Sequence, residues 1–235
     1  MEDLKATLPP GQWAATEFPR FGPPAFADLP DLPSPPVLQL VGDVEVPSEV
    51  GLVELANLPR HEQESDLHCV ATWSRCGLHW SGYRLRDIHE RLIVPRARPH
   101  PEVRYLLFRG LDGFWASLSL EDALSSDVLL ADRLDGEPLS VDHGAPIRLV
   151  APAHYGYKSV KHLGSIELYI ERSLDVLPWQ MHPRARVAEE ERTRFLPGRV
   201  IRPIFRAGLP MLRRRVRQAY EQANQRRRAG RQDAN

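Results

Sequence analysis

The chain has 235 residues and no net formal charge, because 31 Lys and Arg balance 31 Asp and Glu. This length can bury a full core, so we expect one domain with terminal extensions. The charge is unevenly placed: from residue 192 onward 13 Arg face two acids, so the preceding 191 residues carry a net charge of −11. Such a basic tail predicts docking on an acidic surface, its own or a partner's. The acidic body opposes phosphate-backbone contacts, so no nucleic-acid partner is expected.

Cysteine content and the chain start bear on the compartment. Cys69 and Cys76 are too few for a disulfide framework, which favours a reducing environment. Residues 1–5, Met-Glu-Asp-Leu-Lys, lack the charged and apolar regions of a secretory signal. No apolar stretch approaches the roughly 20 residues that span a bilayer. We therefore predict a soluble, cytoplasmic protein.

Residues 1–36 are rich in Pro and Gly. Pro lacks a backbone donor and fixes its own φ, so this segment should form no regular ladder. We expect an extended arm over the domain, and the alternative is a disordered leader. The expected anchors of the arm are four aromatic side chains: Trp13, Phe18, Phe21 and Phe26.

From residue 37 onward, short strands and short helices are interspersed. Helices are expected near 52–57 and 85–92, and a third begins after Ser119, an N-cap with Asp122 three residues on. The strand set indicates an α+β fold, not a doubly wound sheet. Strands are predicted where apolar residues alternate or run together, at 37–41, 66–72, 103–108, 114–118, 128–131, 147–150 and 166–170.

The C-terminal segment shows helical periodicity over 209–227, and its other faces are Arg-rich. The Arg runs at 213–215 and 226–228 could dock a redox partner or an anionic membrane surface. The favoured alternative is that the apolar stripe packs on the body. The stripe recurs at spacings of three and four: Leu209, Leu212, Val216, Ala219, Tyr220 and Ala223.

Cys69 is the residue with the clearest chemical potential, and it lies within the predicted strand 66–72. A single protein thiolate can bind a high-valent metal when a cofactor supplies the remaining ligands. The alternative is a buried core cysteine, the commoner fate of a lone Cys. Cys76 lies among polar and Gly residues, and the two cysteines match no standard zinc spacing.

Residues 69–74 read Cys-Val-Ala-Thr-Trp-Ser, and residues 80–87 read Trp-Ser-Gly-Tyr-Arg-Leu-Arg-Asp. These runs resemble the Cys-Val-x-x-Trp-Ser and Trp-x-Gly-x-x-Leu-x-Asp patterns of the molybdopterin-binding domain of the sulfite oxidase family. The resemblance implies that Cys69 is the molybdenum ligand and acts in catalysis. It also implies that Trp73 and Trp80 wall the cofactor pocket.

Two further segments extend the resemblance over residues 37–172. Residues 134–139 and 143–148 resemble the family's Gly-x-Pro-Leu and His-Gly-x-Pro-x-Arg. Arg148 offers a planar fork for phosphate or carboxylate, and His143 can donate to a phosphate oxygen. An ordinary turn with a surface ion pair is the alternative. The order of the motifs after Cys69 favours cofactor contacts for His143 and Arg148.

Residues 155–161 read Tyr-Gly-Tyr-Lys-Ser-Val-Lys and look like the family's Tyr-Gly-x-Lys-Ser-x-Lys. Backbone N–H groups at a helix start, with two Lys, form an anion site, and the Gly allows close backbone approach. Neither a P-loop nor a Gly-x-Gly-x-x-Gly fingerprint is present, so nucleotide cofactors are poor candidates. The resemblance implies that the cofactor is contacted by Tyr157, Lys158, Ser159, Val160 and Lys161. Lys158 is the second-rank candidate among them.

The resemblance implies a mixed, barrel-like sheet with short helices, holding molybdenum–molybdopterin. The activity implied is oxygen-atom transfer to or from a small substrate, sulfite or an S- or N-oxide. The expected redox partner is a cytochrome or a flavoprotein. We divide the chain into a Pro-rich arm (1–36), a molybdopterin-binding oxidoreductase domain (37–175) and a basic helical extension (176–235).

The chain departs from the family after its last predicted strand. Only about 60 residues follow, and they look helical and basic, where the family carries an immunoglobulin-like dimerisation domain. We expect no room for the haem domain of animal members, and residues 178–186 contain no Tyr to meet the substrate. His182 and Arg184, with Arg186 as a further candidate, either act in catalysis instead or form a cationic surface turn. The missing Tyr supports a non-catalytic cofactor-binding or interaction module. The intact Cys69 favours an enzyme.

Overall fold

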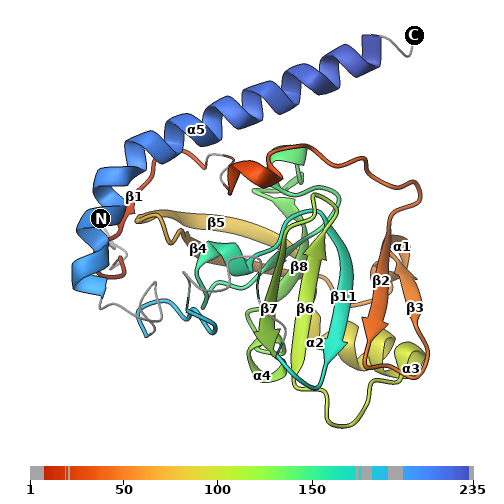
Figure 1. Ribbon diagram of the computed structural model, residues 1–235. Helices are drawn as coiled ribbons and strands as arrows, with labels where there is room; N and C mark the ends of the chain where they lie inside the picture. The colour runs from red at the N-terminus through yellow and green to blue at the C-terminus, as the bar shows by residue number, and fades with distance from the viewer. Residues whose placement is uncertain are drawn as a thin grey trace.

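The computed structural model describes residues 8–18, 20, 22–172, 175, 182–189 and 198–232. In the C-terminal helix it describes the side chains of residues 200, 203, 207, 208, 210, 211 and 213–226. The strands form a six-stranded and a five-stranded sheet, and the C-terminal helix crosses above them (Figure 1).

The six-stranded sheet is organised around one long strand, β5. It has the order β1-β5-β8-β10, with β4 also paired to β5 and β9 to β8. β1 is parallel to β5, and the other pairs are antiparallel. Its strands are β1 (Trp13–Ala14), β4 (His61–His68), β5 (Trp73–Arg84), β8 (Leu129–Leu134), β9 (Glu137–Pro138) and β10 (Arg148–Val150).

The five-stranded sheet has the order β3-β2-β11-β6-β7. β11 runs parallel to β2, although the two are far apart in the sequence, and the remaining pairs are antiparallel. Its strands are β2 (Val37–Gly42), β3 (Ser48–Gly51), β6 (Tyr105–Gly110), β7 (Trp115–Ser119) and β11 (Leu163–Tyr169).

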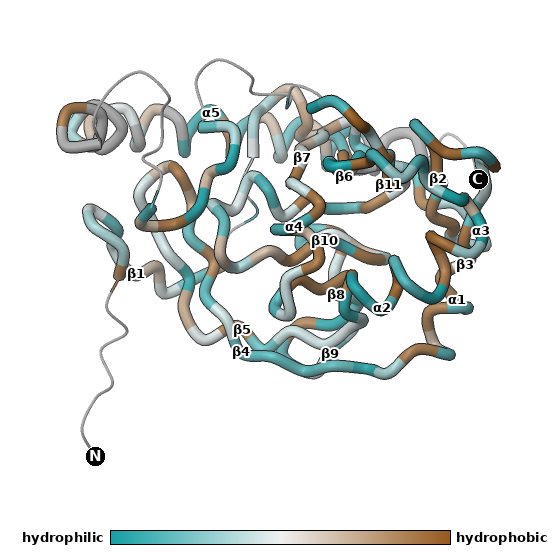
Figure 2. Tube along the Cα trace, turned by 90° about the horizontal axis from the view of Figure 1, so that it is seen from below, coloured by the Kyte–Doolittle hydropathy of each residue, from teal (hydrophilic) through white to brown (hydrophobic). Residues whose placement is uncertain are grey.

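Apolar side chains from both sheets form one large buried core. Leu40, Phe108 and Ile166 enter it from the five-stranded sheet, and Leu130 and Leu149 enter it from the other. Each such side chain stabilises the fold by about 1.5–3 kcal/mol when fully buried. Figure 2 shows hydrophobic segments inside the body and mainly hydrophilic residues along β4, an edge strand.

Short helices connect the strands. Ser119 caps α4 as predicted, because its Oγ accepts a hydrogen bond from Asp122 N at 3.1 Å. Two mixed sheets with short helices confirm the predicted α+β class. The helices are α1 (Leu52–Leu55), α2 (Leu85–Ile88), α3 (Val94–Ala97), α4 (Leu120–Ala123), the π-helical turn η2 (His89–Ile93), and the 3-10 turns η1 (Pro24–Phe26), η3 (Val141–His143) and η4 (Gly156–Lys158).

The strand predicted at 66–72 is wrong at its C-terminal end. β4 ends at His68, and residues 69–72 turn the chain back into β5. Thr72 has a left-handed φ of 78°, which no strand residue adopts, and its N–H donates to Cys69 O at 3.0 Å. The prediction missed β5 itself because its sequence mixes polar residues and Gly with buried Trp.

The N-terminal arm follows the body as an extended segment. The prediction that it forms no ladder is wrong at Trp13–Ala14, which pair with β5 as the short parallel strand β1, because neither residue is a proline. The Phe26 ring meets Phe114 edge-on at a centroid distance of 5.4 Å. Phe18 contacts Trp80 and His143. Three of the four predicted anchors therefore make contacts in the structure, while Phe21 lies outside the described residues.

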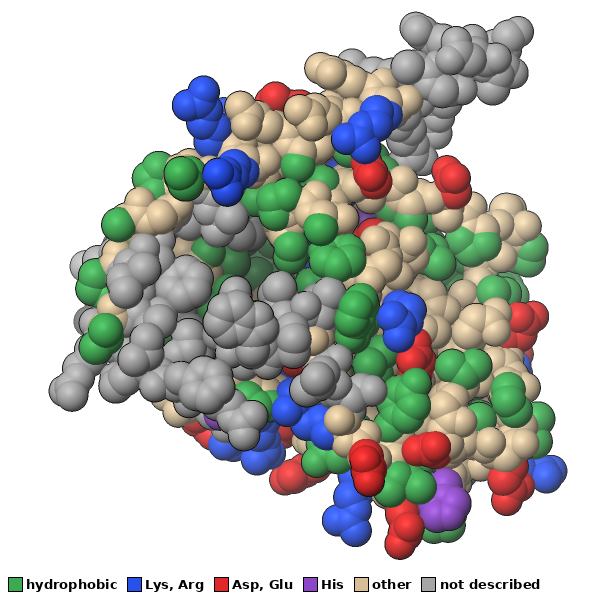
Figure 3. Space-filling model, viewed as in Figure 1, with side chains coloured by type: hydrophobic (Ala, Val, Ile, Leu, Met, Phe, Trp, Pro, Cys, Tyr) green, Lys and Arg blue, Asp and Glu red, His purple; other side chains and the backbone are tan. Residues whose placement is uncertain are grey.

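The C-terminal helix α5 (Gly198–Gln232) is longer than the predicted 209–227 and contains Pro203 and Pro210. Val216 and Ala223 of the predicted stripe are buried, while the side chains of Leu209 and Leu212 lie outside the described residues. The basic side chains along the helix in Figure 3 are arginines, because residues 198–232 contain no Lys. Within the described chain, no helix is both long and apolar enough to cross a membrane.

Candidate cofactor site

Cys69 lies in the tight turn between β4 and β5. Its backbone N–H donates to Trp73 O at 2.8 Å, which closes the turn. The Cys69 side chain shares a buried cluster with Ala71 and Trp73, and Cys69 itself is 9% exposed. We name this group the Cys69 cluster. The predicted metal ligand therefore lies in a turn, and not in the predicted strand, next to the predicted Trp73 wall.

The N-terminal arm covers the Cys69 cluster. Trp13, Ala15 and Phe18 pack against it, and Trp13 N donates to Thr72 O at 3.1 Å. Gln12 Nε2 donates to Cys69 O at 3.1 Å. Sequence reasoning missed Gln12, because no local pattern links a residue of the arm to a turn 57 positions away.

Arg148 is a buried cation held by backbone carbonyls. It begins β10, and its Nη1 and Nη2 donate to His143 O at 3.0 Å and Ser159 O at 3.1 Å. Its guanidinium lies 5.0 Å from the centroid of the Trp80 ring. Burial lowers the pKa of Arg148 to about 10, because no described carboxylate pairs with it.

Lys161 lies beside Arg148 across Gly144. A Cβ on Gly144, whose φ is 106°, would lie 3.0 Å from Lys161 Cβ and 3.1 Å from Arg148 Cβ, so only glycine fits this loop. Lys161 Nζ donates to Asp142 O at 3.0 Å. Burial lowers the pKa of Lys161 to about 7, and the nearby positive charges of Arg148 and Arg20 contribute to the shift.

Arg20 brings a third cation from the arm. Its side chain is 9% exposed, and Nη1 lies 3.8 Å from Asp142 Oδ1 and has no hydrogen bond. A nearby acid is Asp112. Burial raises the pKa of Asp112, and the positive charges of Lys161 and Arg20 oppose that shift. Arg20, Arg148 and Lys161, named here the cationic cluster, therefore exceed Asp112 and Asp142 by one charge. Sequence reasoning missed Arg20 and Asp112, because neither residue belongs to a motif that resembles the family.

His143 joins the cationic cluster to the Cys69 cluster. Its ring stacks on Phe18 at a centroid distance of 4.6 Å and an interplanar angle of 9°. Phe18 also meets Trp80 edge-on at 6.2 Å and packs on the Cys69 cluster. Burial, with Lys161 and Arg148, lowers the pKa of His143 to about 4, so the ring is neutral at pH 7. The structure thus brings the motif around Cys69 and the motif around His143 into contact with one side chain, Phe18.

Residues 155–161 make mostly protein contacts. Tyr157 Oη donates to His182 O at 2.8 Å, and Ser159 Oγ accepts from Ala151 N at 3.1 Å. Val160 is buried in the core. Lys158 is fully buried and donates to three protein oxygens. Of the predicted contacts in this segment, Lys161 alone belongs to the cationic cluster.

The close approach predicted for Gly156 is to the protein itself. A Cβ on Gly156 would lie 2.9 Å from Leu67 Cδ2 and 3.6 Å from His68 O. Leu67 also packs on the Cys69 cluster. The turn η4 therefore lies against the end of β4, next to the residue that precedes Cys69.

His182 and Arg184 lie together in the segment 182–189. Arg184 forms a two-point contact with Asp122, at 2.9 Å from Nε and 2.8 Å from Nη2. Burial opposes ionisation of Asp122, but Arg184, Ser119 and His154 lower its pKa to about 2. His182 Nδ1 accepts from Arg184 N and Ala185 N, both at 3.3 Å. The described contacts of this pair are with Tyr157, Asp122 and Glu121 and not with the Cys69 cluster, and residues 176–181 lie outside the described residues.

The residues present fit an anionic organic group that carries a metal. The cationic cluster lacks a full set of counter-charges, and two buried polar atoms nearby, Thr72 Oγ1 and His143 Nδ1, have no hydrogen-bond partner. A phosphate or a polar ring would satisfy both needs. In the described part of the chain, no three His, Cys, Asp or Glu side chains gather as metal ligands. The described residues that could hold such a group are therefore the thiol of Cys69 for the metal and the cationic cluster for the anion.

The family model of the oxidoreductase molybdopterin binding domain matches residues 31–176. The chain belongs to this family. Its members carry molybdopterin, and enzymes of the family are oxidoreductases. The match includes the Cys69 turn, Arg148 and Lys161, whereas most of the arm and all of α5 lie outside it.

Three curated relatives share part of their length with this molybdopterin-binding chain. Uncharacterized oxidoreductase YuiH of Bacillus subtilis is 34% identical over 168 residues, 70% of this chain and 80% of that protein. Protein-methionine-sulfoxide reductase catalytic subunit MsrP of Campylobacter jejuni is 28% identical over 57% of this chain and 49% of its own length. Sulfite oxidase of Arabidopsis thaliana is 28% identical over 57% of this chain and 42% of its own length. The chain thus matches less than half of the length of MsrP and of the plant sulfite oxidase.

A solved structure shares the fold. Sulfane dehydrogenase SoxCD from Paracoccus pantotrophus has a TM-score of 0.55 at 22% identity, over 71% of this chain and 46% of that chain. At this identity the likeness shows the fold alone. It supports the α+β architecture that places the Cys69 turn at one end of β5.

Lys161 should make anion binding depend on pH. The pKa of Lys161 in the folded chain, about 7, lies below its value in the unfolded chain. Between these two pKa values the unfolded state binds more protons, so the stability of the ligand-free protein rises with pH in that range. A bound anion favours the charged lysine, so binding should take up a proton and weaken above pH 7. Calorimetry with sulfate at pH 6.5 and 9, in buffers of different ionisation enthalpy, measures both effects. Lys161→Met should abolish the proton uptake, and pH-independent affinity of the unaltered chain would refute the assignment.

Proposed function

We propose that this protein is a molybdenum–molybdopterin-dependent oxidoreductase that transfers an oxygen atom to or from a small substrate, sulfite or an S- or N-oxide. The observation that carries the proposal is the junction at Phe18. One ring there contacts the Cys69 cluster, His143 and Trp80, and Trp80 lies under Arg148. The Cys69 cluster and two residues beside the cationic cluster thus meet at one side chain.

Each element of the junction has a task in this proposal. Cys69 holds the metal, and Trp73 and Trp80 exclude water from it. Arg148 and Lys161 bind the phosphate of the cofactor, and neutral His143 offers a hydrogen bond to its polar ring. When bound, molybdenum–molybdopterin supplies the two-electron chemistry and the site of oxygen exchange.

The remaining motif residues have weaker structural support. Tyr157, Ser159 and Val160 act by positioning the segment that carries Lys161, because their described contacts are to protein. His182 and Arg184 stay predicted catalytic residues. Asp122 holds the Arg184 guanidinium, so a substrate contact would need that ion pair to open.

The substrate class rests on the relatives. One relative is a sulfite oxidase, and another is a protein-methionine-sulfoxide reductase subunit. In the oxidising direction, sulfite and water give sulfate, two protons and two electrons for an acceptor. In the reducing direction, a sulfoxide or N-oxide, two protons and two electrons give water and the deoxygenated product.

Steady-state turnover tests the proposal in both directions. The protein is made in a molybdate-fed, cofactor-competent host, and a tungstate-fed preparation serves as the matched control. Oxidation of sulfite is followed with ferricyanide, and reduction of methionine sulfoxide or trimethylamine N-oxide with a reduced viologen. We expect turnover in one direction that the tungstate preparation lacks. Molybdenum-loaded protein inert toward all three substrates would reject this substrate range.

We propose that a separate redox protein, a cytochrome or a flavoprotein, exchanges the electrons. The basic C-terminal segment, with 13 Arg against two acids from residue 192 onward, favours an acidic partner surface. Peripheral contact with an anionic membrane is the alternative docking mode for the same charge. A partner's association rate that falls steeply with salt would support the first.

One observation favours the alternative function, a non-catalytic cofactor-binding or interaction module. The arm packs over the Cys69 cluster and leaves Cys69 only 9% exposed. A module of this kind would bind molybdopterin and show no turnover with any acceptor. The same turnover assay, combined with the molybdenum content, separates the two functions.

A further inference from the structure

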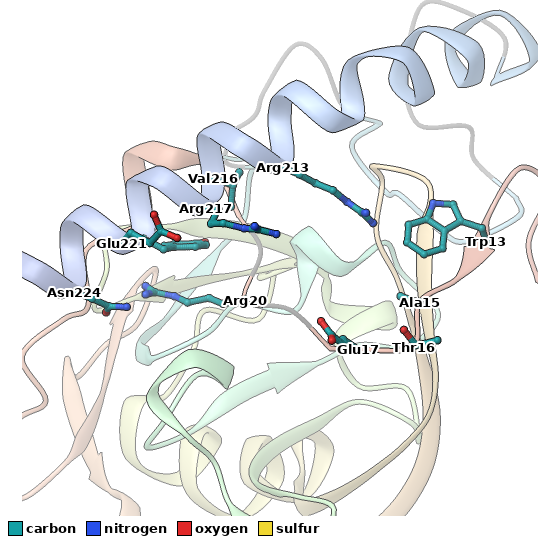
Figure 4. Close-up of a pocket in the computed structure, with 11 residues that line it drawn as sticks. Trp13, Ala15, Thr16, Glu17, Arg20, Arg213, Val216, Arg217, Glu221 and Asn224 are labelled. Carbon is teal, nitrogen blue, oxygen red and sulfur yellow. The ribbon is translucent and has the colours of Figure 1, made fainter.

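A cavity of about 340 Å³ lies between the N-terminal arm and α5 (Figure 4). Trp13 and Ala15 line it and also pack on the Cys69 cluster, so one layer of the arm separates the two. The other wall is α5, which contributes Arg213, Val216 and Arg217. Because the arm up to residue 30 and α5 lie outside the family match, these two extensions build the cavity.

The cavity carries cations without counter-charges. The side chains of Arg213 and Arg217 extend from α5 on the side of the arm in Figure 4. Neither makes an ion pair or a hydrogen bond with any residue that the structure describes. Glu17 and Glu221 also line the cavity, so its three Arg, including Arg20, leave an excess of one positive charge.

Arg20 gives independent support for a ligand. Its side chain is nine-tenths buried, it lines the cavity, and its Nη1 has no hydrogen-bond partner. A buried donor without an acceptor is costly in proteins. The ion-pair partner of Arg20, Asp142, lies 3.8 Å away, so a negative charge held in the cavity would stabilise the Arg20 guanidinium through space.

Two aromatic rings, Trp13 and Tyr220, also line the cavity, each with a guanidinium over one face. The Arg213 guanidinium lies 4.7 Å from the Trp13 ring centroid, and that of Arg20 lies 4.0 Å from the Tyr220 ring centroid. Val216 adds apolar surface and is buried. A bare inorganic oxyanion would leave most of this surface and volume unfilled, whereas a planar organic body would cover it.

We propose that this cavity binds an organic monoanion, a carboxylate or sulfonate on a planar apolar body, which bridges the arm and α5. The anionic group lies between Arg213 and Arg217, and the planar body lies along Trp13. Binding requires neither molybdenum nor turnover, so this proposal stands or falls separately from the oxidoreductase function.

Calorimetry on the full-length, cofactor-loaded protein tests the site with 2-naphthalenesulfonate as the probe. The neutral analogue 2-naphthalenemethanol and inorganic sulfate are the comparison ligands. We expect the sulfonate to bind at least about tenfold more tightly than either. Equal binding of the neutral analogue would overturn the anion assignment, and equal binding of sulfate would overturn the organic one.

A matched pair of variants locates the probe. Arg213→Gln with Arg217→Gln removes the two lining cations and should weaken sulfonate binding by about tenfold or more. Arg214→Gln with Arg215→Gln removes the same charge from exposed positions of α5 that do not line the cavity, and should leave the affinity unchanged. An equal loss in both pairs would show a diffuse charge effect and overturn the site.

Hydrogen exchange gives a readout independent of these variants. Because the ligand bridges two extensions, sulfonate should slow amide exchange in residues 12–17 and in 213–224 together. The neutral analogue 2-naphthalenemethanol, added at the same concentration, should give no such protection. Protection confined to other parts of the chain would overturn the proposal even if the probe binds.

Discussion

Cys69→Ser should abolish turnover, by more than about a hundredfold, and remove most of the bound molybdenum. A thiolate is a soft anionic ligand, whereas a serine hydroxyl keeps its proton at neutral pH and binds the metal poorly. The turn itself should persist, because backbone groups of Cys69, Thr72 and Trp73 make its hydrogen bonds. Mass spectrometry of molybdenum per chain and fluorescence of the released pterin measure the loss.

Cys76→Ser is the control for this prediction. Cys76 lies half-buried in β5, and burial together with Asp66 raises the pKa of its thiol to about 11. A thiol so hard to ionise is a poor ligand, so the variant should keep its molybdenum and its activity. Full metal content in Cys69→Ser, or the same loss in both variants, would contradict the role of Cys69.

Lys158→Met should destabilise the fold by about 3–5 kcal/mol, the range for breaking a buried ion pair. Lys158 Nζ lies 2.7 Å from each of Asp175 Oδ2, Ser117 O and Pro183 O. Burial lowers the pKa of Lys158, while Asp175 opposes that shift. Removing the cation leaves two carbonyl oxygens without a donor and leaves Arg172, 3.7 Å away, as the described counter-charge of the buried Asp175 carboxylate. Denaturant unfolding gives the change in the free energy of unfolding.

The double variant Lys158→Met with Asp175→Asn separates a structural role from a cofactor role. The asparagine removes the stranded charge, so the double variant should be more stable than Lys158→Met alone. The folded fraction of Lys158→Met should still bind molybdopterin. A loss of cofactor with less than about 1 kcal/mol of destabilisation would instead make Lys158 the direct contact that the sequence motif suggested.

The motifs of this chain could be found from the sequence because Cys, Trp, His, Arg and Lys at these spacings and in this order form a specific pattern. Cys69 with two Trp, then His143 and Arg148, then Lys161, all come together around Phe18 or the cationic cluster. The same reasoning ranked Lys158 below its neighbours, and the structure gives it three protein partners. The strand ending at Thr72 was wrong, because apolar content does not reveal a left-handed turn.

The sequence by itself determined the α+β class, the cofactor motifs and the helix at the C-terminus, since these depend on local periodicity and on residue identity. Only the tertiary structure decided that Gln12, Phe18 and Arg20 of the arm border the Cys69 turn and the cationic cluster. It also decided that α5 closes a cavity over that arm. Such contacts join segments as many as 198 positions apart, as in the pair of Asp28 and Arg226. Long-range contacts follow from how the sheets pack, and no short window of sequence specifies that packing.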